Sequence, residues 1–183
     1  MKAVGIVASP RMDGNTAFVV GRVLEGTGAE GRVFGMNGIE PCSACMACKG
    51  TVRCVKRDGM QAIYEALAVS DLLVVGSPIY LDHISAQAWT FLNRLYCFIG
   101  PAPQLENRWR GPRRCLVTAT QGRPAEGHYL PQLGQITAVL RKYWSIECQE
   151  PLVVGGCRRE PDLAARPEVI SAALAAGRRL AGR

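Results

Sequence analysis

Short runs of apolar residues alternate along this chain with longer segments in which apolar residues recur every three or four positions. The first pattern predicts strands that are buried on both faces, and the second predicts helices with one apolar face. Residues 72–77, Leu-Leu-Val-Val-Gly-Ser, form the clearest central strand. Further strands are predicted at residues 3–8, 32–35, 115–120 and 147–154, and helices at 16–24, 60–68, 85–98, 129–144 and 167–180.

The alternation of strands and helices defines the expected fold class. It predicts an α/β protein whose five-stranded parallel sheet is covered by helices on both faces, a three-layer sandwich. No internal repeat, low-complexity segment or linker interrupts the pattern. Residues 1–183 are therefore predicted to form a single domain.

Composition narrows the class of protein. Hydrophobic residues make up 48% of the 183 residues, which favours a globular chain with a substantial core over a disordered one. The apolar run at residues 3–8 leads into a polar turn without a cleavage-site pattern, so we expect a first strand there rather than a signal peptide. No stretch has the roughly 20 consecutive apolar residues of a membrane span, and no membrane association is expected.

The net charge of +7 is compatible with several kinds of partner. Much of the excess lies in arginine-rich segments at residues 108–114, 158–159 and 178–183. Such segments can bind nucleic acid, but scattered arginines more often form a solvated face. They can also attract an anionic nucleotide or an acidic redox protein.

Four of the eight cysteines lie within thirteen residues, in the pattern C-x2-C-x2-C-x5-C. Cysteine thiolates ligate iron–sulfur clusters, and compact C-x2-C-x2-C runs are a recurring cluster signature. Zinc sites more commonly use two separated C-x2-C pairs, and a turn whose cysteines bind no metal is the remaining alternative. The favoured ligands of an iron–sulfur cluster are Cys42, Cys45, Cys48 and Cys54.

The remaining cysteines are expected to pack in the protein rather than to bind metal. Cys115 and Cys148 lie in or beside predicted strands, where cysteine behaves as a small apolar residue. Cys97 and Cys157 lie outside the motif as well. A chain of this size does not need disulfides for stability, so its cysteines indicate a reducing, cytoplasmic setting.

The turn after the first strand has the groups that a phosphate requires. It lacks the glycine patterns of dinucleotide-binding turns and P-loops. However, Gly14 lets the backbone turn its N–H groups inward, and the next helix presents the positive end of its dipole. An ordinary polar turn is the alternative. The candidate phosphate donors are Ser9, Arg11, Asn15 and Thr16.

A parallel sheet would bring three turns to one edge, because ligands of open α/β sheets bind at the carboxyl ends of the strands. The first strand leads to residues 9–16, the third to 77–82 and the fourth to 120–122. The second strand leads to the cysteine-rich segment. We therefore predict that FMN binds beside a cluster at this edge of the sheet. The edge combines a phosphate site, a wall that contains proline and tyrosine, and a group of cysteines.

Over most of its length, the chain resembles the iron–sulfur flavoprotein branch of the NADPH-dependent FMN reductase family. The resemblance rests on Ser-Pro-Arg and Gly-Asn-Thr within residues 9–16, the cysteines of 42–54, Gly-Ser-Pro-Ile-Tyr at 76–80 and Ser-Ala-Gln at 85–87. It implies a flavodoxin-like fold, FMN with its phosphate on the first turn, and a 4Fe–4S cluster on the four cysteines. It also implies a flavin ring that lies against Pro78, Ile79, Tyr80, Leu81, Thr120, Gln121 and Gly122.

The chain departs from the family pattern on the predicted helix at residues 85–98. Many relatives have a lysine and then Asp-Arg after the Ser-Ala-Gln motif, whereas this chain has Trp89 and Asn93-Arg94. In relatives this helix often lies in a subunit interface, so the departures affect the mode of association rather than the fold. We expect a homodimer or a homotetramer.

Together these patterns predict an FMN-dependent electron-transfer oxidoreductase that passes electrons between a 4Fe–4S cluster and FMN. The expected partner is NAD(P)H or a small redox protein such as ferredoxin, and no side chain is assigned as a catalytic acid or base. One alternative is an NAD(P)H-dependent FMN or quinone reductase without a cluster. Another, from a different class, is a basic, zinc-bearing nucleic-acid-binding module. Metal analysis of the purified protein would distinguish the three. Iron with sulfide indicates the first function, neither metal indicates the second, and zinc indicates the third.

Overall fold

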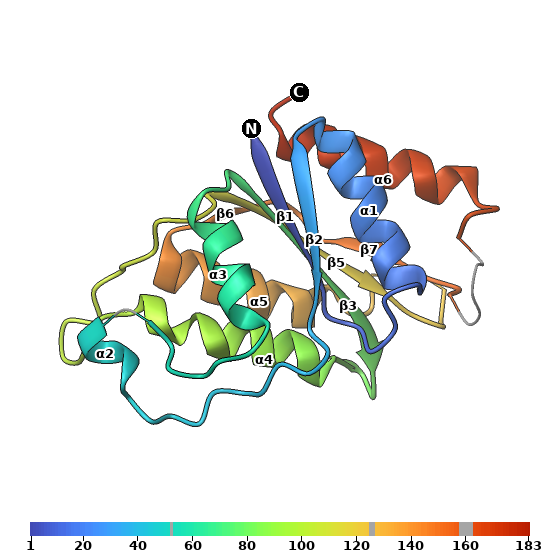
Figure 1. The fold of residues 1–183 in the computed structure, drawn as a ribbon. Coiled ribbons are helices and arrows are strands. Elements are labelled where there is room, and N and C mark those ends of the chain that lie inside the picture. Colours follow the sequence, from blue (N-terminus) through green and yellow to red (C-terminus); the bar gives the residue numbers. More distant parts are fainter. Residues whose placement is uncertain (52, 125–126, 158–162) are drawn as a thin grey trace.

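The computed structural model describes residues 1–51, 53–124, 127–157 and 163–183, which form one twisted sheet between two layers of helices (Figure 1). The strand order is β2-β1-β3-β5-β6, in which every neighbouring pair is parallel. β7 is also parallel to β5, and the short β4 runs antiparallel beside the end of β3. The strands are β1 (Lys2–Val7), β2 (Glu30–Gly35), β3 (Leu72–Tyr80), β4 (His83–Ile84), β5 (Arg114–Thr120), β6 (Glu147–Cys148) and β7 (Leu152–Val154).

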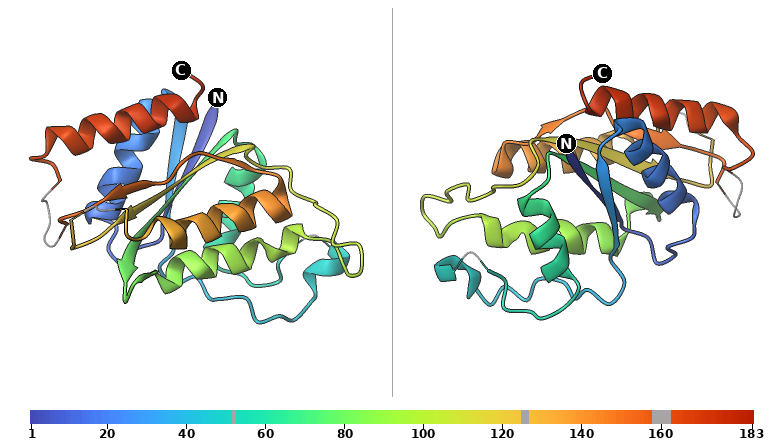
Figure 2. Two further views of the ribbon diagram at one scale, coloured as in Figure 1. Left: turned by 180° about the vertical axis from the view of Figure 1, so that it is seen from behind. Right: turned by 45° about the horizontal axis from the view of Figure 1, so that its top comes forward.

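Helices cover both faces of the sheet. They are α1 (Asn15–Thr27), α2 (Cys48–Thr51), α3 (Met60–Ala68), α4 (Ala86–Arg94), the 3-10 helix η1 (Leu95–Phe98), α5 (Leu130–Trp144) and α6 (Pro167–Leu180). Figures 1 and 2 show α1 and α6 on one face, and α3, α4 and α5 on the other. Leu72 and Val74 of β3 pack in the core with α1 and α6, whereas Leu73 and Val75 pack in the core with the other helices. Burial on both faces explains why this strand has a continuous apolar sequence.

The predicted α/β class with its parallel sheet is confirmed, but the described residues form seven strands in the sheet rather than five. The segment predicted as one strand at residues 147–154 forms two strands, β6 and β7, with Pro151 between them. Proline has no N–H to donate to a neighbouring strand and therefore interrupts the ladder. The other additional strand, β4, is a two-residue return that pairs with the end of β3.

The strand order determines where a ligand can bind. β2 and β3 lie on opposite sides of β1. The direction in which successive strands are placed in the sheet therefore reverses at β1. At such a reversal the loops after neighbouring strands separate and leave a crevice at the carboxyl ends of the strands. The turn after β1 and the segment after β3 therefore border the same crevice.

The described part of the chain contains no helix that is long and apolar enough to cross a membrane. Of the arginines in the predicted basic segments, Arg178 and Arg179 are exposed in the last turn of α6. Arg158 and Arg159 lie outside the described residues.

Two glycines allow α1 and α6 to approach closely. A Cβ atom on Gly26 would overlap the carbonyl oxygen of Leu174, and one on Gly177 would overlap that of Val23. Because backbone atoms can give way only if the helices separate, we expect Gly26→Ala to lower the free energy of unfolding by about 1–3 kcal/mol in urea denaturation. Gly21→Ala is the matched control on the same helix, since its added Cβ would meet no described atom within 4 Å apart from its chain neighbours and the nearby backbone of its own helix. It should raise stability by about 0.4–1 kcal/mol, and equal effects of the two variants would contradict this account.

Candidate functional site

A small cavity of about 70 Å³, which we call the phosphate pocket, lies at the carboxyl ends of β1, β3 and β5. The structure brings to it every residue that the sequence analysis assigns to FMN, apart from Leu81. Gly14 and Cys157 line the pocket as well. The assigned residues in the lining are Ser9, Arg11, Asn15, Thr16, Pro78, Ile79, Tyr80, Thr120, Gln121 and Gly122.

Hydrogen bonds fix the turn between β1 and α1 at this pocket. The hydroxyls of Thr16 and Thr120 lie 2.7 Å apart and share a hydrogen bond that joins the start of α1 to the end of β5. Ser9 Oγ accepts a hydrogen bond of 3.2 Å from the backbone N–H of Arg11. Asn15 is the first residue of α1, so the positive end of the helix dipole lies at the pocket. This arrangement suits an anionic group.

The chemistry of the pocket fits a phosphate ester. Arg11 supplies a positive charge, and among the described residues that line the pocket none is acidic. Gly14 and Gly122 have no side chains to fill the space beside the backbone. The Nε2 of Gln121 donates to the carbonyl oxygen of Pro124 at 3.0 Å, while its buried Oε1 has no hydrogen-bond partner among the described residues. A pocket with donors and no carboxylate favours an anion over a cation.

A larger cavity of about 380 Å³ adjoins the phosphate pocket. The residues common to both are Ile79, Gln121 and Gly122. Leu81, whose side chain is 99% exposed, lines the larger cavity instead of the pocket. There, Tyr129 Oη donates a hydrogen bond of 2.6 Å to Asp82 Oδ1, which lowers the pKa of the Asp82 carboxyl. No sequence pattern links these two residues, and the sequence analysis did not predict this pair.

Ser85 connects the phosphate pocket to α4. Its Oγ donates to the carbonyl oxygen of Ala8 at 2.6 Å and accepts from the N–H of Ala88 at 3.1 Å, which caps the helix. The N–H of Ser85 donates to Ser77 Oγ at 3.0 Å. Ala8 precedes the turn of the phosphate pocket, and Ser77 precedes Pro78. One residue, through its hydroxyl and its backbone N–H, therefore fixes two walls of the pocket and the start of α4.

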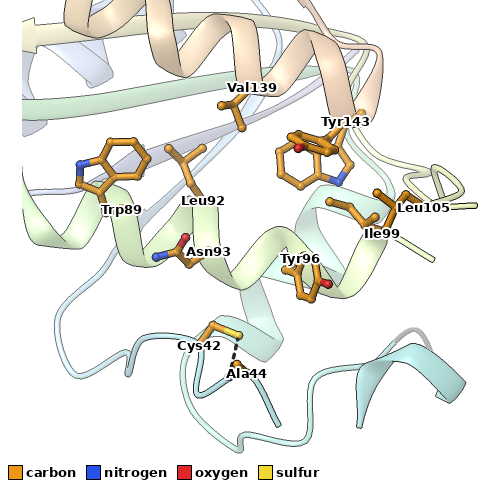
Figure 3. A pocket seen from close by; sticks show the side chains of 11 residues that line it. Cys42, Ala44, Trp89, Leu92, Asn93, Tyr96, Ile99, Leu105, Val139 and Tyr143 are labelled. Carbon is orange, nitrogen blue, oxygen red and sulfur yellow. Dashed lines mark hydrogen bonds between the residues drawn. The ribbon is translucent and has the colours of Figure 1, made fainter. Parts of the chain in front are cut away.

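Residues 42–54, which we call the cysteine segment, lie against α4 and η1 (Figures 1 and 3). Its four cysteines line one small cavity of about 20 Å³ together with Tyr96. All four thiols are free; those of Cys42 and Cys45 are exposed, and those of Cys48 and Cys54 are half-buried. The structure thus brings all four predicted ligands to one cavity.

The cysteine segment offers four thiols, which are the donor set of an iron–sulfur cluster. Within the described ranges, no three histidine, cysteine or acidic side chains converge closely enough to hold one ion. The Ala44 N–H donates to Cys42 Sγ at 3.4 Å, and hydrogen bonds to ligand sulfurs are one means of tuning a cluster. Ala44 and Met46 have left-handed backbones (φ 53° and 62°), which are unfavourable for residues with a Cβ.

An apolar groove of about 550 Å³ lies between α4, α5 and the cysteine segment. Figure 3 shows Leu92 of α4 and Val139 of α5 pointing toward one another across it, with Cys42 at its edge. Trp89, at 37% exposure, also lines the groove. The groove therefore presents apolar and aromatic side chains beside the cysteine segment.

Cys157 and Arg94 take roles at these sites that the sequence analysis did not predict. Cys157, expected to pack in the protein, lines the phosphate pocket. It follows β7, whose carboxyl end lies at the same edge of the sheet, so the strand-end rule applied to the last strand would have found it. Arg94 forms a buried ion pair with Asp58, beside the cysteine segment. No local motif marks that pair.

Solved structures with similar architecture establish the class of fold. A flavone reductase matches with a TM-score of 0.72 at 16% identity, over 100% of this chain and 62% of that one. The NAD(P)H:quinone oxidoreductase from Methanothermobacter marburgensis matches with a TM-score of 0.69 at 15% identity, over 98% of both chains. A flavodoxin from the domain Archaea matches with a TM-score of 0.60 at 12% identity, over 100% of this chain and 97% of that one. The protein has the predicted flavodoxin-like fold.

Sequence comparison then identifies the family. The family model for NADPH-dependent FMN reductase matches residues 1–150, and the chain belongs to this family of flavin-dependent oxidoreductases. An iron–sulfur flavoprotein of Archaeoglobus fulgidus is 33% identical over 131 residues, which are 69% of this chain and 58% of the relative. One of Methanosarcina thermophila is 35% identical over 99 residues, 51% of this chain and 52% of the relative. The chain thus spans a little over half the length of these curated relatives, which agree with the predicted branch of the family.

Proposed function

We propose that this protein is an FMN-dependent electron-transfer oxidoreductase that passes electrons between a 4Fe–4S cluster and FMN. The observation that carries the proposal is the pairing of two sites. The turns expected to bind FMN meet in one pocket at the β1/β3 reversal, and four free cysteines line one cavity beside α4. Two relatives that are about one-third identical are named iron–sulfur flavoproteins.

For FMN, we propose that the phosphate binds between Ser9, Arg11, Asn15 and Thr16 at the N-terminus of α1. The flavin ring would lie against Pro78, Ile79, Tyr80 and Leu81 on one side of the crevice and Thr120, Gln121 and Gly122 on the other. When bound, FMN supplies exchange of electrons singly or in pairs, while the protein holds and orients it. The adjoining cavity of about 380 Å³ provides the space beside the pocket that the ring requires.

For the cluster, we propose Cys42, Cys45, Cys48 and Cys54 as ligands. Their shared cavity and the N–H bond to Cys42 Sγ support this assignment. The proposed partner is NAD(P)H or a small redox protein such as ferredoxin, in a cytoplasmic setting. We also propose a homodimer or homotetramer, since the apolar groove beside Trp89 offers surface to a second subunit. Sedimentation of the FMN-loaded protein would test the assembly.

The second candidate function is an NAD(P)H-dependent FMN or quinone reductase without a cluster. It is favoured by the exposure of Cys42 and Cys45, which leaves two of the four proposed ligands open to solvent. The nucleic-acid-binding alternative is disfavoured by family membership.

Anaerobic purification tests the proposal directly. We expect bound FMN together with iron and acid-labile sulfide, each at about four per protein for a 4Fe–4S cluster. FMN without iron or sulfide, even after reconstitution, would instead establish the reductase without a cluster. Zinc without flavin would contradict both.

A further inference from the structure

Arg94, the last residue of α4, holds both ends of the cysteine segment. Its side chain is fully buried, at 0% exposure. Nη1 donates to Asp58 Oδ2 at 2.6 Å and to the carbonyl oxygen of Glu40 at 2.8 Å, and Nη2 donates to Asp58 Oδ1 at 3.1 Å. Glu40 lies just before Cys42, and Asp58 lies shortly after Cys54. One guanidinium therefore joins the chain on either side of the four cysteines.

Two other side chains fasten the interior of the segment to the fold. Lys49 Nζ donates to the carbonyl oxygens of Tyr96 at 2.8 Å and Ile99 at 2.6 Å. Gln61 Nε2 donates to the carbonyl oxygen of Cys54 at 3.1 Å.

Arg94 bonds to both flanks at once, at the base of the segment. The same flanks are also joined directly, by the exposed ion pair of Lys56 with Glu40 and by a long hydrogen bond of 3.4 Å from the Glu40 N–H to Asp58 Oδ2. Arg94 is the buried member of this closure.

α4 connects the base of the cysteine segment to the phosphate pocket. Ser85 fixes the start of the helix to Ala8 and Ser77 beside the pocket, and Arg94 ends it at the cysteine segment. Nine helical residues span about 14 Å at 1.5 Å per residue. The helix therefore sets the position of the cysteine segment relative to the pocket.

We propose that Arg94 is a positioning residue for the cluster: it closes the cysteine segment into its ligand-binding conformation and, through α4, sets its placement beside the flavin. The inference rests on the proposed function, since it requires that the segment binds a cluster. An arginine suits the role because its planar fork reaches both carboxylate oxygens and a carbonyl oxygen together. Burial alone would raise the pKa of the Asp58 carboxyl, but the hydrogen bonds from Arg94 bring it below its ordinary value, so the pair is ionised.

Arg94→Lys tests the geometry while retaining the charge. In the reconstituted holoprotein, we expect iron loss to a chelator to be at least about tenfold faster than in wild type, because an ammonium cannot make the three bonds together. In protein stripped of metal, trypsin should cleave the segment after Lys49 and Arg53 faster by a similar factor. Arg22→Lys, a half-buried position on α1, is the matched control and should change neither rate.

A double variant separates positioning from general stability. Arg94→Met alone would leave the Asp58 carboxylate buried without its partner and could unfold the protein. Arg94→Met with Asp58→Leu replaces both partners of the ion pair by apolar side chains. The Met60 N–H loses its acceptor on Asp58, so thermal stability should fall, but far less than in Arg94→Met alone, and FMN affinity should remain near wild type. The tie to Glu40 is still lost, so iron loss and tryptic cleavage should remain about tenfold faster.

The outcomes distinguish this inference from the function on which it rests. Wild-type rates of iron loss and cleavage in Arg94→Lys and in the double variant would overturn the positioning role and leave the cluster in place. Iron and sulfide absent from the reconstituted wild type would overturn the proposed function and this inference with it.

Discussion

Replacing Cys48 with serine is expected to remove the iron–sulfur cluster while FMN remains bound. Cys48 begins α2, is half-buried and lines the cavity that all four cysteines share. A serine hydroxyl is a harder and more basic ligand than a thiol, so it holds iron poorly. After anaerobic reconstitution and desalting, iron and sulfide per FMN should fall by at least about tenfold. The phosphate pocket lies on other turns, so flavin content should equal that of wild type.

Cys115→Ser is the control for a cysteine outside the segment. Cys115 is buried in β5 opposite Cys148, far along the chain from the proposed ligands. A buried hydroxyl costs about 1–3 kcal/mol of stability, but iron, sulfide and FMN should all be retained. Full iron content in Cys48→Ser, or equal loss in the two variants, would remove Cys48 from the ligand set.

The main elements of the fold could be predicted because their signals are local. The helix predicted at residues 167–180 coincides with α6, and the apolar run at residues 72–77 lies within β3. The division of the last strand was not predicted, although the sequence marks it: residues 147–150 read Glu-Cys-Gln-Glu, the apolar run begins only at Leu152, and Pro151 between them has no N–H to donate. The short helix α2 was missed because the cysteine segment is held by contacts with residues far along the chain. Lys49 within it donates to the carbonyl oxygen of Tyr96, and Arg94 donates to the carbonyl oxygen of Glu40 beside it.

The candidate site was predictable to the extent that parallel strands determine it. Strand ends that lie side by side bring their turns together, which is why residues far apart in sequence meet at the phosphate pocket. The orientation of Leu81 does not follow from that rule. Leu81 and Asp82 both have left-handed backbones (φ 46° and 63°), and this tight return into β4 leaves the Leu81 side chain exposed. The pairing of Arg94 with Asp58 likewise depends on how α4 docks, which no local pattern encodes.

Asn15→Asp is expected to weaken FMN binding by at least tenfold, or about 1–3 kcal/mol. Asn15 is 7% exposed and lines the phosphate pocket as the first residue of α1. The substitution keeps the size of the side chain but places a carboxylate against the proposed site of the phosphate. Repulsion between the two anions should raise the dissociation constant, which titration of the flavin-free protein with FMN would measure.

Because Asn15 lies in the first turn of α1, the melting temperature can distinguish a loss of FMN binding from a loss of structure. An acidic side chain in the first turn of a helix interacts favourably with the dipole, so Asn15→Asp should not lower the melting temperature of the flavin-free protein. Asn93→Asp makes the same chemical change at an exposed position on α4, away from the pocket, and should leave FMN affinity unchanged. If both variants bind FMN as tightly as wild type, the phosphate does not lie at the start of α1. If Asn15→Asp loses affinity while its melting temperature is maintained, the effect is electrostatic repulsion within an intact pocket.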